Sequence, residues 1–331
     1  MKKRQRRAPW LLLAGLLLVL LVAVCSVLHI ADVQVSEAPK VLVSVETGHF
    51  FGDYERVVPC DIPCEFRRSV TNADARWYHL CGASPQRERP SQALILMSME
   101  SSVNYPCLGD GSYLKQFDIK ATYRMDSHVP IIYLMPDHLR YFERPLNAYK
   151  NTVVFLQGNC NSRTGREDVV KRLVELAPVH KFTVESRGSC LNNAPPFPRG
   201  ENKKDGLKSY KFALSFENSE DTDYITEKIW DSLAAGNIPI YFGAREIETY
   251  IPHPMAFINF RKYETPERLA DYLDMLIDNQ TLYGEHHRWR RMPIEKLNPG
   301  YQQLVRMVRG PHSQCLMCKQ VAAWRESHGV I

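Results

Sequence analysis

The stretch YKFALSFENSEDTDYITEKIWDSLAAGNIPIYFG (residues 210–243) decides the fold class of this chain. Its two apolar runs, KFALSFE and IPIYFG, predict buried strands, and the segment from Asp223 to Ala235 between them predicts a helix. Ile225, Ile229 and Leu233 recur at every fourth position and predict the buried stripe of that helix. A strand–helix–strand unit of this length is typical of a doubly wound α/β domain with a parallel sheet.

Polar side chains gather in this unit at the point where the first strand ends and the helix begins. They are Glu217, Asn218, Asp223, Tyr224, Glu227 and Lys228. Ligands of doubly wound sheets bind beyond the carboxyl ends of the strands, where the free N–H groups of a helix N-terminus attract anions. The pattern predicts a site for a phosphorylated ligand, and a solvated helix start is the alternative that these residues leave open.

The same strand–helix pattern extends over most of the chain. Apolar runs without period-2 alternation, such as ALILM and PIIYL, indicate strands that are buried on both faces, as in a parallel sheet. Strands are predicted at residues 40–47, 75–80, 93–100, 129–134, 152–157 and 181–186, helices at 165–177 and 265–279, and a polar loop at 192–209. We expect an α/β fold of two doubly wound domains that face a cleft, at residues 40–147 and 148–300, followed by a C-terminal segment at 301–331.

The N-terminus predicts a membrane anchor. Lys and Arg crowd residues 2–7, and the run from Trp10 to Ile30 carries no charged side chain. At about 1.5 Å per residue this run spans roughly 31 Å, which matches the core of a bilayer. The excess of Lys and Arg then predicts a cytoplasmic tail at residues 1–9, a transmembrane signal anchor at 10–30, a short stem at 31–39 and a luminal remainder. A cleaved signal peptide is the alternative.

Cysteine usage agrees with an oxidising compartment. Eight of the nine cysteines follow the predicted anchor, and an even number favours disulfides. They are Cys60, Cys64, Cys81, Cys107, Cys160, Cys190, Cys315 and Cys318. The pairing stays open, and a four-thiolate zinc site made by CDIPC (60–64) and CLMC (315–318) is the alternative. The sequon at Asn279 predicts a glycosylation site and fits the same compartment.

The charge distribution argues against nucleic acid as a partner. The net charge of +5 includes the basic N-terminal cluster, so the predicted luminal part is close to neutral and shows no basic face. His286 and His287 fall in a charged segment with Arg288, Arg290 and Arg291. That pattern predicts surface residues on a helix rather than a ligand set.

The polar unit belongs to a longer set of matches. FENS (216–219), DYITEK (223–228) and AAGNIPIYFGA (234–244) resemble the signature of the α1,3-fucosyltransferases, glycosyltransferase family 10. Similar segments of that family are matched by SMES (98–101), YRMDSHVP (123–130), GNCNSRTGR (158–166) and the CLMC near the C-terminus. PCDIPCEF (59–66) and GSCLNN (188–193) look most like the plant-type core α1,3-fucosyltransferases, so the matches cover most of residues 58–318.

This resemblance implies a GT-B fold, in which two Rossmann-like domains face a cleft. It implies a GDP-fucose-binding donor domain at residues 148–300 and an acceptor side at 40–147. It also implies transfer of L-fucose from GDP-β-L-fucose, with inversion, to GlcNAc of glycoprotein glycans in α1,3 linkage, the N-glycan core being favoured. A single-pass type II protein of the Golgi membrane with a luminal catalytic domain is the location that the resemblance and the predicted anchor imply together.

The resemblance assigns the diphosphate of the donor to basic side chains. Arg166 matches the family's arginine by spacing, and Arg163 is the local alternative. A planar guanidinium holds phosphate oxygens through two parallel hydrogen bonds. Lys228 is expected to add a second positive charge, and such electrostatic stabilisation is usually the largest catalytic contribution.

The other polar residues of the opening stretch complete the implied donor site. Asn218 and Tyr224 are expected to contact guanosine, and Glu227 is expected to accept hydrogen bonds from fucose hydroxyls. Glu217 is included because it leads directly into the same turn. No cofactor is implied beyond the substrate GDP-fucose.

The resemblance places the catalytic base on the other domain. Glu100, at the end of the predicted strand ALILMSME, matches the family's proposed catalytic glutamate. A free glutamate has a pKa of about 4.3, so a closed cleft must raise it for efficient proton abstraction. Asp221-Thr222-Asp223 looks like the Asp-x-Asp motif that holds a divalent metal in other glycosyltransferases. We expect instead that Asp223 caps the helix and that no metal is required.

Two alternatives to a glycan fucosyltransferase stay open. One is transfer of fucose directly to protein hydroxyls. The other is a catalytically dead relative that acts as a luminal chaperone or binds glycans, although Glu100, Arg166, Glu227 and Lys228 are all present. The precise acceptor and the oligomeric state do not follow from these residues.

Overall fold

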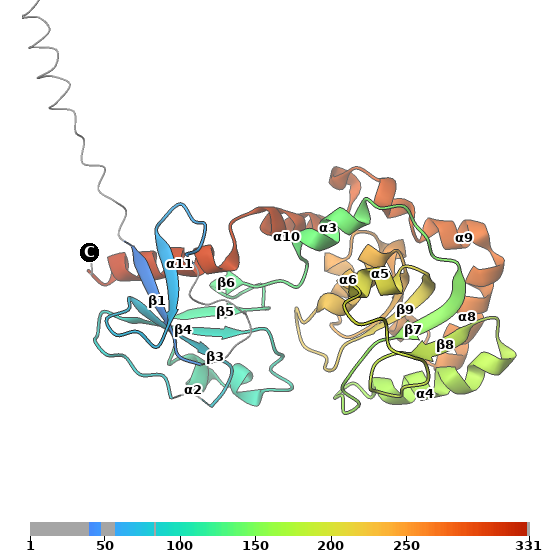
Figure 1. The fold of residues 1–331 in the computed structure, drawn as a ribbon, viewed down its shortest axis with the longest axis horizontal. Helices are drawn as coiled ribbons and strands as arrows, with labels where there is room; N and C mark the ends of the chain where they lie inside the picture. The colour runs from blue at the N-terminus through green and yellow to red at the C-terminus, as the bar shows by residue number, and fades with distance from the viewer. Residues whose placement is uncertain (1–39, 48–56, 83, 330–331) are drawn as a thin grey trace, which may run out of the picture. The chain divides into compact units, whose positions relative to one another are not determined.

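The computed structural model describes residues 40–47, 57–82 and 84–329, and Val41–Ile331 forms one compact unit (Figure 1). The predicted tail, anchor and stem, residues 1–39, lie outside the described residues. Within the described ranges, no helix has both the length and the apolar character needed to cross a bilayer.

The first sheet has six parallel strands in the order β2-β1-β3-β4-β5-β6. The strands are β1 Val41–Val45, β2 Cys64–Arg68, β3 Ala75–His79, β4 Ala93–Ser98, β5 Ile119–Thr122 and β6 Val129–Pro130. All six residues of β4 are buried, which confirms the interpretation of its unbroken apolar run. The strand predicted at 129–134 is too long, because β5 ends at Thr122 and leaves the residues after Pro130 no strand to pair with.

The second sheet has five parallel strands in the order β11-β10-β9-β7-β8. The strands are β7 Lys150–Phe155, β8 Thr183–Ser186, β9 Tyr210–Phe216, β10 Ile238–Phe242 and β11 Ile258–Asn259. Side chains of β7 alternate between its two faces: Val153 and Phe155 pack in one cluster with α4 and α8, whereas Val154 packs with α5 and the end of α6. Helices therefore cover both faces, which confirms the predicted doubly wound sheet.

Most helices follow the strands of the second sheet. They are α4 Arg166–Leu176, α5 Lys203–Leu207, α6 Glu227–Ala235, α7 Ile247–Tyr250, α8 Pro266–Asp278 and α9 Gln280–Glu285. The described part also contains α2 Gly111–Leu114, α3 Pro136–Phe142, and the 3-10 turns η1 Pro106–Gly109, η2 Ala177–Val179, η3 Pro254–Ala256, η4 Phe260–Lys262, η5 Arg288–Arg291 and η6 Ile294–Lys296. The Thr265 hydroxyl accepts a hydrogen bond from the Arg268 N–H and caps α8, which confirms the helix predicted from residue 265. The polar loop predicted at 192–209 is interrupted by α5.

Helix α6 begins at Glu227, so the predicted start at Asp223 is wrong by about one turn. Asp223 has a left-handed backbone (φ 64°) and is not a cap, because its carboxylate accepts hydrogen bonds from the Met125 N–H and the Tyr250 hydroxyl. Thr226 is the residue before the helix, and both its N–H and its hydroxyl donate to Glu217. These bonds hold residues 218–225 as a loop outside the helix.

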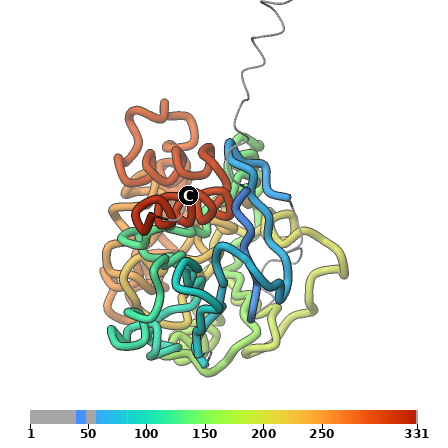
Figure 2. The backbone as a smooth tube through the Cα atoms, turned by 90° about the vertical axis from the view of Figure 1, so that its left-hand side faces the viewer, coloured from blue at the N-terminus to red at the C-terminus, as the bar shows by residue number. Residues whose placement is uncertain are grey.

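The C-terminal segment crosses from the second sheet back to the first. Helix α10 Pro299–Arg309 packs on α7, and α11 Ser313–Ser327 packs against β1, β4, β5 and β6, beside the N-terminal strand in Figure 2. Disulfides Cys60–Cys315 and Cys64–Cys318 attach α11 to the start of β2. The remaining bridges are Cys81–Cys107 and Cys160–Cys190, so all eight predicted cysteines are paired, and thiols in disulfides cannot form the alternative zinc site.

The prediction that His286 and His287 lie on the surface is wrong. Their exposed fractions are 2% and 9%, because α9 ends at Glu285 and the chain turns both rings inward ahead of the buried Trp289. The His286 Nε2 lies 3.1 Å from the Tyr272 hydroxyl. Burial lowers the pKa of His286 to about 4 and that of His287 to about 3.

The buried histidines predict acid lability. When the pH falls below about 6.5, these histidines bind protons in the unfolded chain but not in the folded protein. The free energy of unfolding therefore decreases from about pH 6.5 down to the lowered pKa values of the folded state. Each of the two histidines should lower the free energy of unfolding by about 2 kcal/mol when the pH falls from 7 to 5. We expect His287→Phe to remove the contribution of one histidine from the difference in the free energy of unfolding between pH 7 and pH 5, measured by urea unfolding at both pH values. An unchanged dependence would contradict the burial of a neutral His287.

The paired disulfides predict unequal losses on removal. With Cys60–Cys315 intact, Cys64–Cys318 closes only a small ring, so Cys64→Ser/Cys318→Ser should cost about 2–3 kcal/mol in the chain-entropy account. Removing both bridges also opens a loop of about 255 residues and should cost about 5 kcal/mol more. Thermal unfolding of the double and quadruple variants measures the difference; two equal steps would show that the long loop contributes nothing.

Candidate active site

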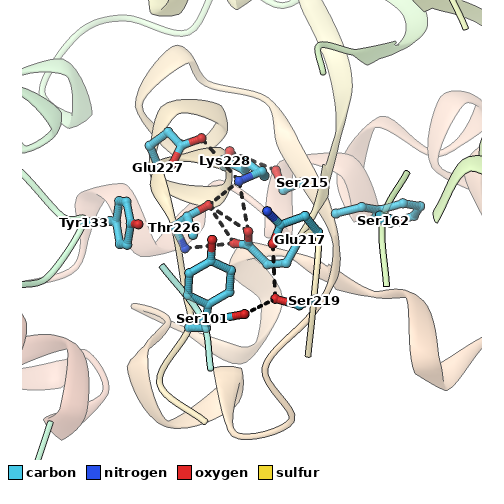
Figure 3. Close-up of polar contacts among 12 residues, drawn as sticks. Ser101, Tyr133, Ser162, Ser215, Glu217, Ser219, Thr226, Glu227 and Lys228 are labelled. Carbon is cyan, nitrogen blue, oxygen red and sulfur yellow. Dashed lines mark hydrogen bonds and ion pairs between the residues drawn. The ribbon is translucent and has the colours of Figure 1, made fainter. Parts of the chain in front are cut away.

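The carboxylate of Glu217 is the centre of the polar turn between β9 and α6. Glu217 is fully buried and follows the last residue of β9. It accepts hydrogen bonds from the Thr226 N–H (2.8 Å) and hydroxyl (2.8 and 2.9 Å), and the Lys228 Nζ lies 3.0 Å away (Figure 3). Thr226 and Lys228 are therefore partners of one buried anion, which excludes the alternative of a merely solvated helix start for these two residues.

The charges of this cluster are coupled. Burial raises the pKa of Glu217, although Lys228 opposes the shift. Burial disfavours the ammonium of Lys228, but Glu217 and Glu227 outweigh it and raise the pKa of Lys228. Burial likewise acts to raise the pKa of Glu227, but the lysines nearby outweigh it and lower that pKa. With 43% of its side chain exposed, Glu227 is an ionised acceptor that a ligand can reach.

The two candidate arginines occupy different environments. Arg166 is 1% exposed, and its guanidinium donates to the carbonyl oxygens of Phe216 (2.7 Å) and Asn159 (2.9 Å). It thereby ties the loop after β7 to the end of β9. Arg163 is exposed, and its N–H donates to the carbonyl oxygen of Asn218 (2.7 Å). Of the two guanidinium groups, only that of Arg163 is open to a ligand in this arrangement.

Glu100 and Tyr224 come together from the two sheets. Glu100 is half-buried just beyond β4, and its Oε2 lies 3.5 Å from the Tyr224 hydroxyl. That distance is long for a hydrogen bond, as contacts in unliganded catalytic sites often are. Tyr224 is 3% exposed and packs edge-on against Tyr123 and Tyr133, so its ring is not open to a guanine base; burial raises its pKa, and the hydroxyl remains a donor toward Glu100.

A cavity of about 360 Å³ opens beside Glu100. Its walls come from the loops after β4 and β5, and they include Glu100, Ser102, Leu108, Tyr123, Arg124 and Asp126. The Cys81–Cys107 disulfide holds η1, which carries Leu108, against the loop after β3. The cavity combines hydroxyl, charged and apolar groups, as small-molecule sites commonly do.

Two further predicted residues have structural partners. Asn218 is half-buried, and its side-chain oxygen accepts a hydrogen bond from the Ser219 hydroxyl (3.1 Å). Asn279 is exposed and caps α9 through the Leu282 N–H (2.9 Å). The structure does not bring Asn279 to the site.

Sequence reasoning missed two residues of this region. Thr226 lies inside the DYITEK match, and its position between an acid-ended strand and a helix was the signal that could have identified it. Tyr133, whose hydroxyl donates to the carbonyl oxygen of Met99 next to Glu100, had no local signal, because the contact joins residues 34 positions apart.

The Glu217–Lys228 pair predicts a specific stability pattern. Lys228→Met leaves a buried carboxylate without its cation and should cost about 3–5 kcal/mol at pH 7. Protonation of Glu217 relieves that cost, so the penalty should shrink as the pH falls toward 5. Glu217→Gln/Lys228→Met should recover most of the loss in urea unfolding. A double variant no more stable than Lys228→Met would contradict the coupling.

Comparisons with known proteins agree with the resemblance found in the sequence. Residues 146–330 match the model of glycosyltransferase family 10 (fucosyltransferase) C-term. The chain is 33% identical over 239 residues to α-(1,3)-fucosyltransferase B of Drosophila melanogaster, an alignment that covers 64% of this chain and 52% of that protein. It is 30% identical over 266 residues to GDP-fucose protein O-fucosyltransferase 3 of Danio rerio, covering 70% and 56%. The chain thus spans about half the length of these relatives.

Solved structures show the same fold. An α1,3-fucosyltransferase crystallised with GDP-fucose aligns with a TM-score of 0.57 at 16% identity, covering 82% of this chain and 90% of that one. The same kind of enzyme with GDP aligns with a TM-score of 0.58, covering 89% and 92%. The two parallel sheets therefore have the arrangement of a fucosyltransferase fold, and because the family model matches more than half of its length, this chain belongs to glycosyltransferase family 10.

Proposed function

We propose that this protein is an inverting α1,3-fucosyltransferase that moves L-fucose from GDP-β-L-fucose to GlcNAc of glycoprotein glycans, with the N-glycan core as the favoured acceptor. The observation that carries the proposal is the approach of Glu100 to Tyr224 at 3.5 Å. It brings a carboxylate that lines a cavity close to the loop that leads into α6, where Glu227 and Lys228 stand in the first turn.

On the donor side, basic groups receive the diphosphate of GDP-fucose. Lys228 and the exposed Arg163 offer positive charge at the carboxyl ends of the strands. Arg166 contributes by fixing the loop that carries Arg163, since its own guanidinium is engaged by carbonyl oxygens. Glu227 accepts hydrogen bonds from fucose hydroxyls, and Asn218 contacts the nucleotide.

On the acceptor side, Glu100 is the catalytic base. The cavity beside it receives the GlcNAc residue, and Glu100 removes the proton of the attacking hydroxyl. The oxygen forms a bond with the fucose anomeric carbon as the bond to the phosphate oxygen breaks, and GDP leaves with that electron pair. Attack from the face opposite the phosphate inverts the anomeric centre.

The proposed reaction requires no divalent metal. Asp221 and Asp223 accept hydrogen bonds from protein donors, which supports a structural role for the Asp-x-Asp-like segment. The accompanying proposals are a luminal catalytic domain, anchoring in the Golgi membrane through residues 10–30, and glycosylation at Asn279.

A second candidate function is transfer to protein hydroxyls. The similarity to a GDP-fucose protein O-fucosyltransferase over 70% of this chain favours it. A catalytically dead luminal chaperone is less well supported, because Glu100 faces Tyr224 and Glu227 remains accessible.

The test is transfer of labelled fucose by the purified full-length chain in detergent. We expect label on a trimmed N-glycopeptide, unaffected by EDTA. Glu100→Gln should lower kcat about 10²–10⁴-fold because the base is lost, whereas Glu88→Gln, an exposed control on the same sheet's periphery, should keep the wild-type rate.

Other outcomes discriminate among the candidates. Label found only on a folded protein acceptor would favour the protein O-fucosyltransferase. Loss of label with EDTA would return Asp221 and Asp223 to a metal-binding role. Binding of GDP-fucose without transfer to any acceptor would support the dead relative, and no binding would overturn the donor site.

A further inference from the structure

The carboxylate of Asp221 is a meeting point of the two sheets. Its Oδ2 accepts hydrogen bonds from the Ser102 N–H (2.8 Å), the Ser102 hydroxyl (2.6 Å) and the Tyr123 hydroxyl (2.7 Å). Asp221 lies in the loop between β9 and α6, whereas Ser102 and Tyr123 follow β4 and β5 of the first sheet. Three donors converge on one carboxylate oxygen, and hydrogen bonds to a carboxylate are stronger than those between neutral groups.

Three further contacts lie close to this carboxylate. The Asp223 Oδ2 accepts from the Met125 N–H (3.0 Å), and its Oδ1 accepts from the Tyr250 hydroxyl (2.8 Å). The Ser101 and Ser219 hydroxyls lie 2.5 Å apart and are both buried, as Figure 3 shows. Every one of these contacts except that to Tyr250 joins the β9–α6 loop to a loop of the first sheet.

The contacts involve residues close to the proposed base and residues close to the start of α6. Ser102 is two residues after Glu100, and Tyr123 lines the same cavity as Glu100. In the loop between β9 and α6, Asp221 precedes Tyr224 by three residues and the N-terminus of α6 by six. A shift of Ser102 would therefore move Glu100 relative to Tyr224 and Glu227.

We propose that Asp221 is a positioning residue. It holds the turn after β4 that carries Ser102, and with it Glu100, against the loop between β9 and α6 (residues 218–225). Asp223 provides a second contact between the same parts of the chain. We call the hydrogen bonds from Ser102, Tyr123 and Met125 to these two carboxylates the clasp. The proposal rests on the proposed function for its catalytic consequence, but the clasp itself is a set of contacts that can be measured without turnover. A misplacement of about 1 Å between reacting groups can cost roughly 10²-fold in rate.

The discriminating variant is Asp221→Asn, which keeps the size of the side chain and removes its charge. Its matched control is Glu220→Gln, because Glu220 pairs with Arg245 and Arg261 on its own side of the site. We expect kcat for fucose transfer to fall roughly 10- to 100-fold in Asp221→Asn. The dissociation constant of GDP should change less than about twofold, because the base, not the donor site, is displaced.

Two measurements separate positioning from a general loss of stability. Hydrogen exchange of the Ser102 amide should become faster in Asp221→Asn and stay unchanged in Glu220→Gln, while the core amides of β4 keep their protection. Tyr123→Phe removes one donor to the same oxygen, so its effect on kcat should not add to that of Asp221→Asn. Asp221→Glu should restore part of kcat by returning the charge.

The outcomes distinguish failure of the clasp from failure of the proposed function. An active wild type with equal kcat for Asp221→Asn and Glu220→Gln would overturn the positioning role. Unchanged exchange at Ser102 in Asp221→Asn would overturn the clasp even if no transfer were detected. Faster exchange at Ser102 in a protein that transfers no fucose would retain the clasp and refute the proposed function.

Discussion

The fully buried carboxylate of Glu217 is the constraint on which the site depends. A buried anion without partners is costly, and Thr226 and Lys228 supply those partners. Since both of these residues stand at the start of α6, the bonds decide where the helix begins. They leave the eight residues from 218 to 225 as a loop, and that loop carries the side chains that reach across to the first sheet.

The site therefore depends on elements of both sheets, which hold its residues in place from the donor side and from the acceptor side. On the donor side, β9 and α6 hold the loop, and Arg166 ties the loop after β7 to the same strand end. On the acceptor side, Glu100 lies two residues beyond the fully buried strand β4, and α11 is attached to the first sheet by two disulfides. Because catalysis as proposed requires groups from both sheets, contacts between the two loops matter more than the rigidity of either sheet.

The parts of the fold that could be predicted from the sequence are those with a local pattern. Strand β4 has five apolar residues in succession, β9 is largely apolar, and α8 has a Thr-Pro-Glu start, so these elements could be predicted from their local sequence. Strand β2 was not predicted, because CEFRR buries three residues and exposes two arginines, which gives neither alternation nor an apolar run.

The candidate site shows the same division. Glu217, Glu227 and Lys228 were placed together by their closeness in sequence, but the burial of Arg166 and the roles of Asp221 and Asp223 depend on partners about 50 to 120 positions away.

The most direct measurement of the central claim is a crystal structure of the full chain with GDP-fucose. We expect the diphosphate at Lys228 and Arg163, and the fucose ring between Glu227 and Glu100, with Glu100 on the face opposite the phosphate. A nucleotide bound elsewhere, or Glu100 on the same face as the phosphate, would contradict that claim.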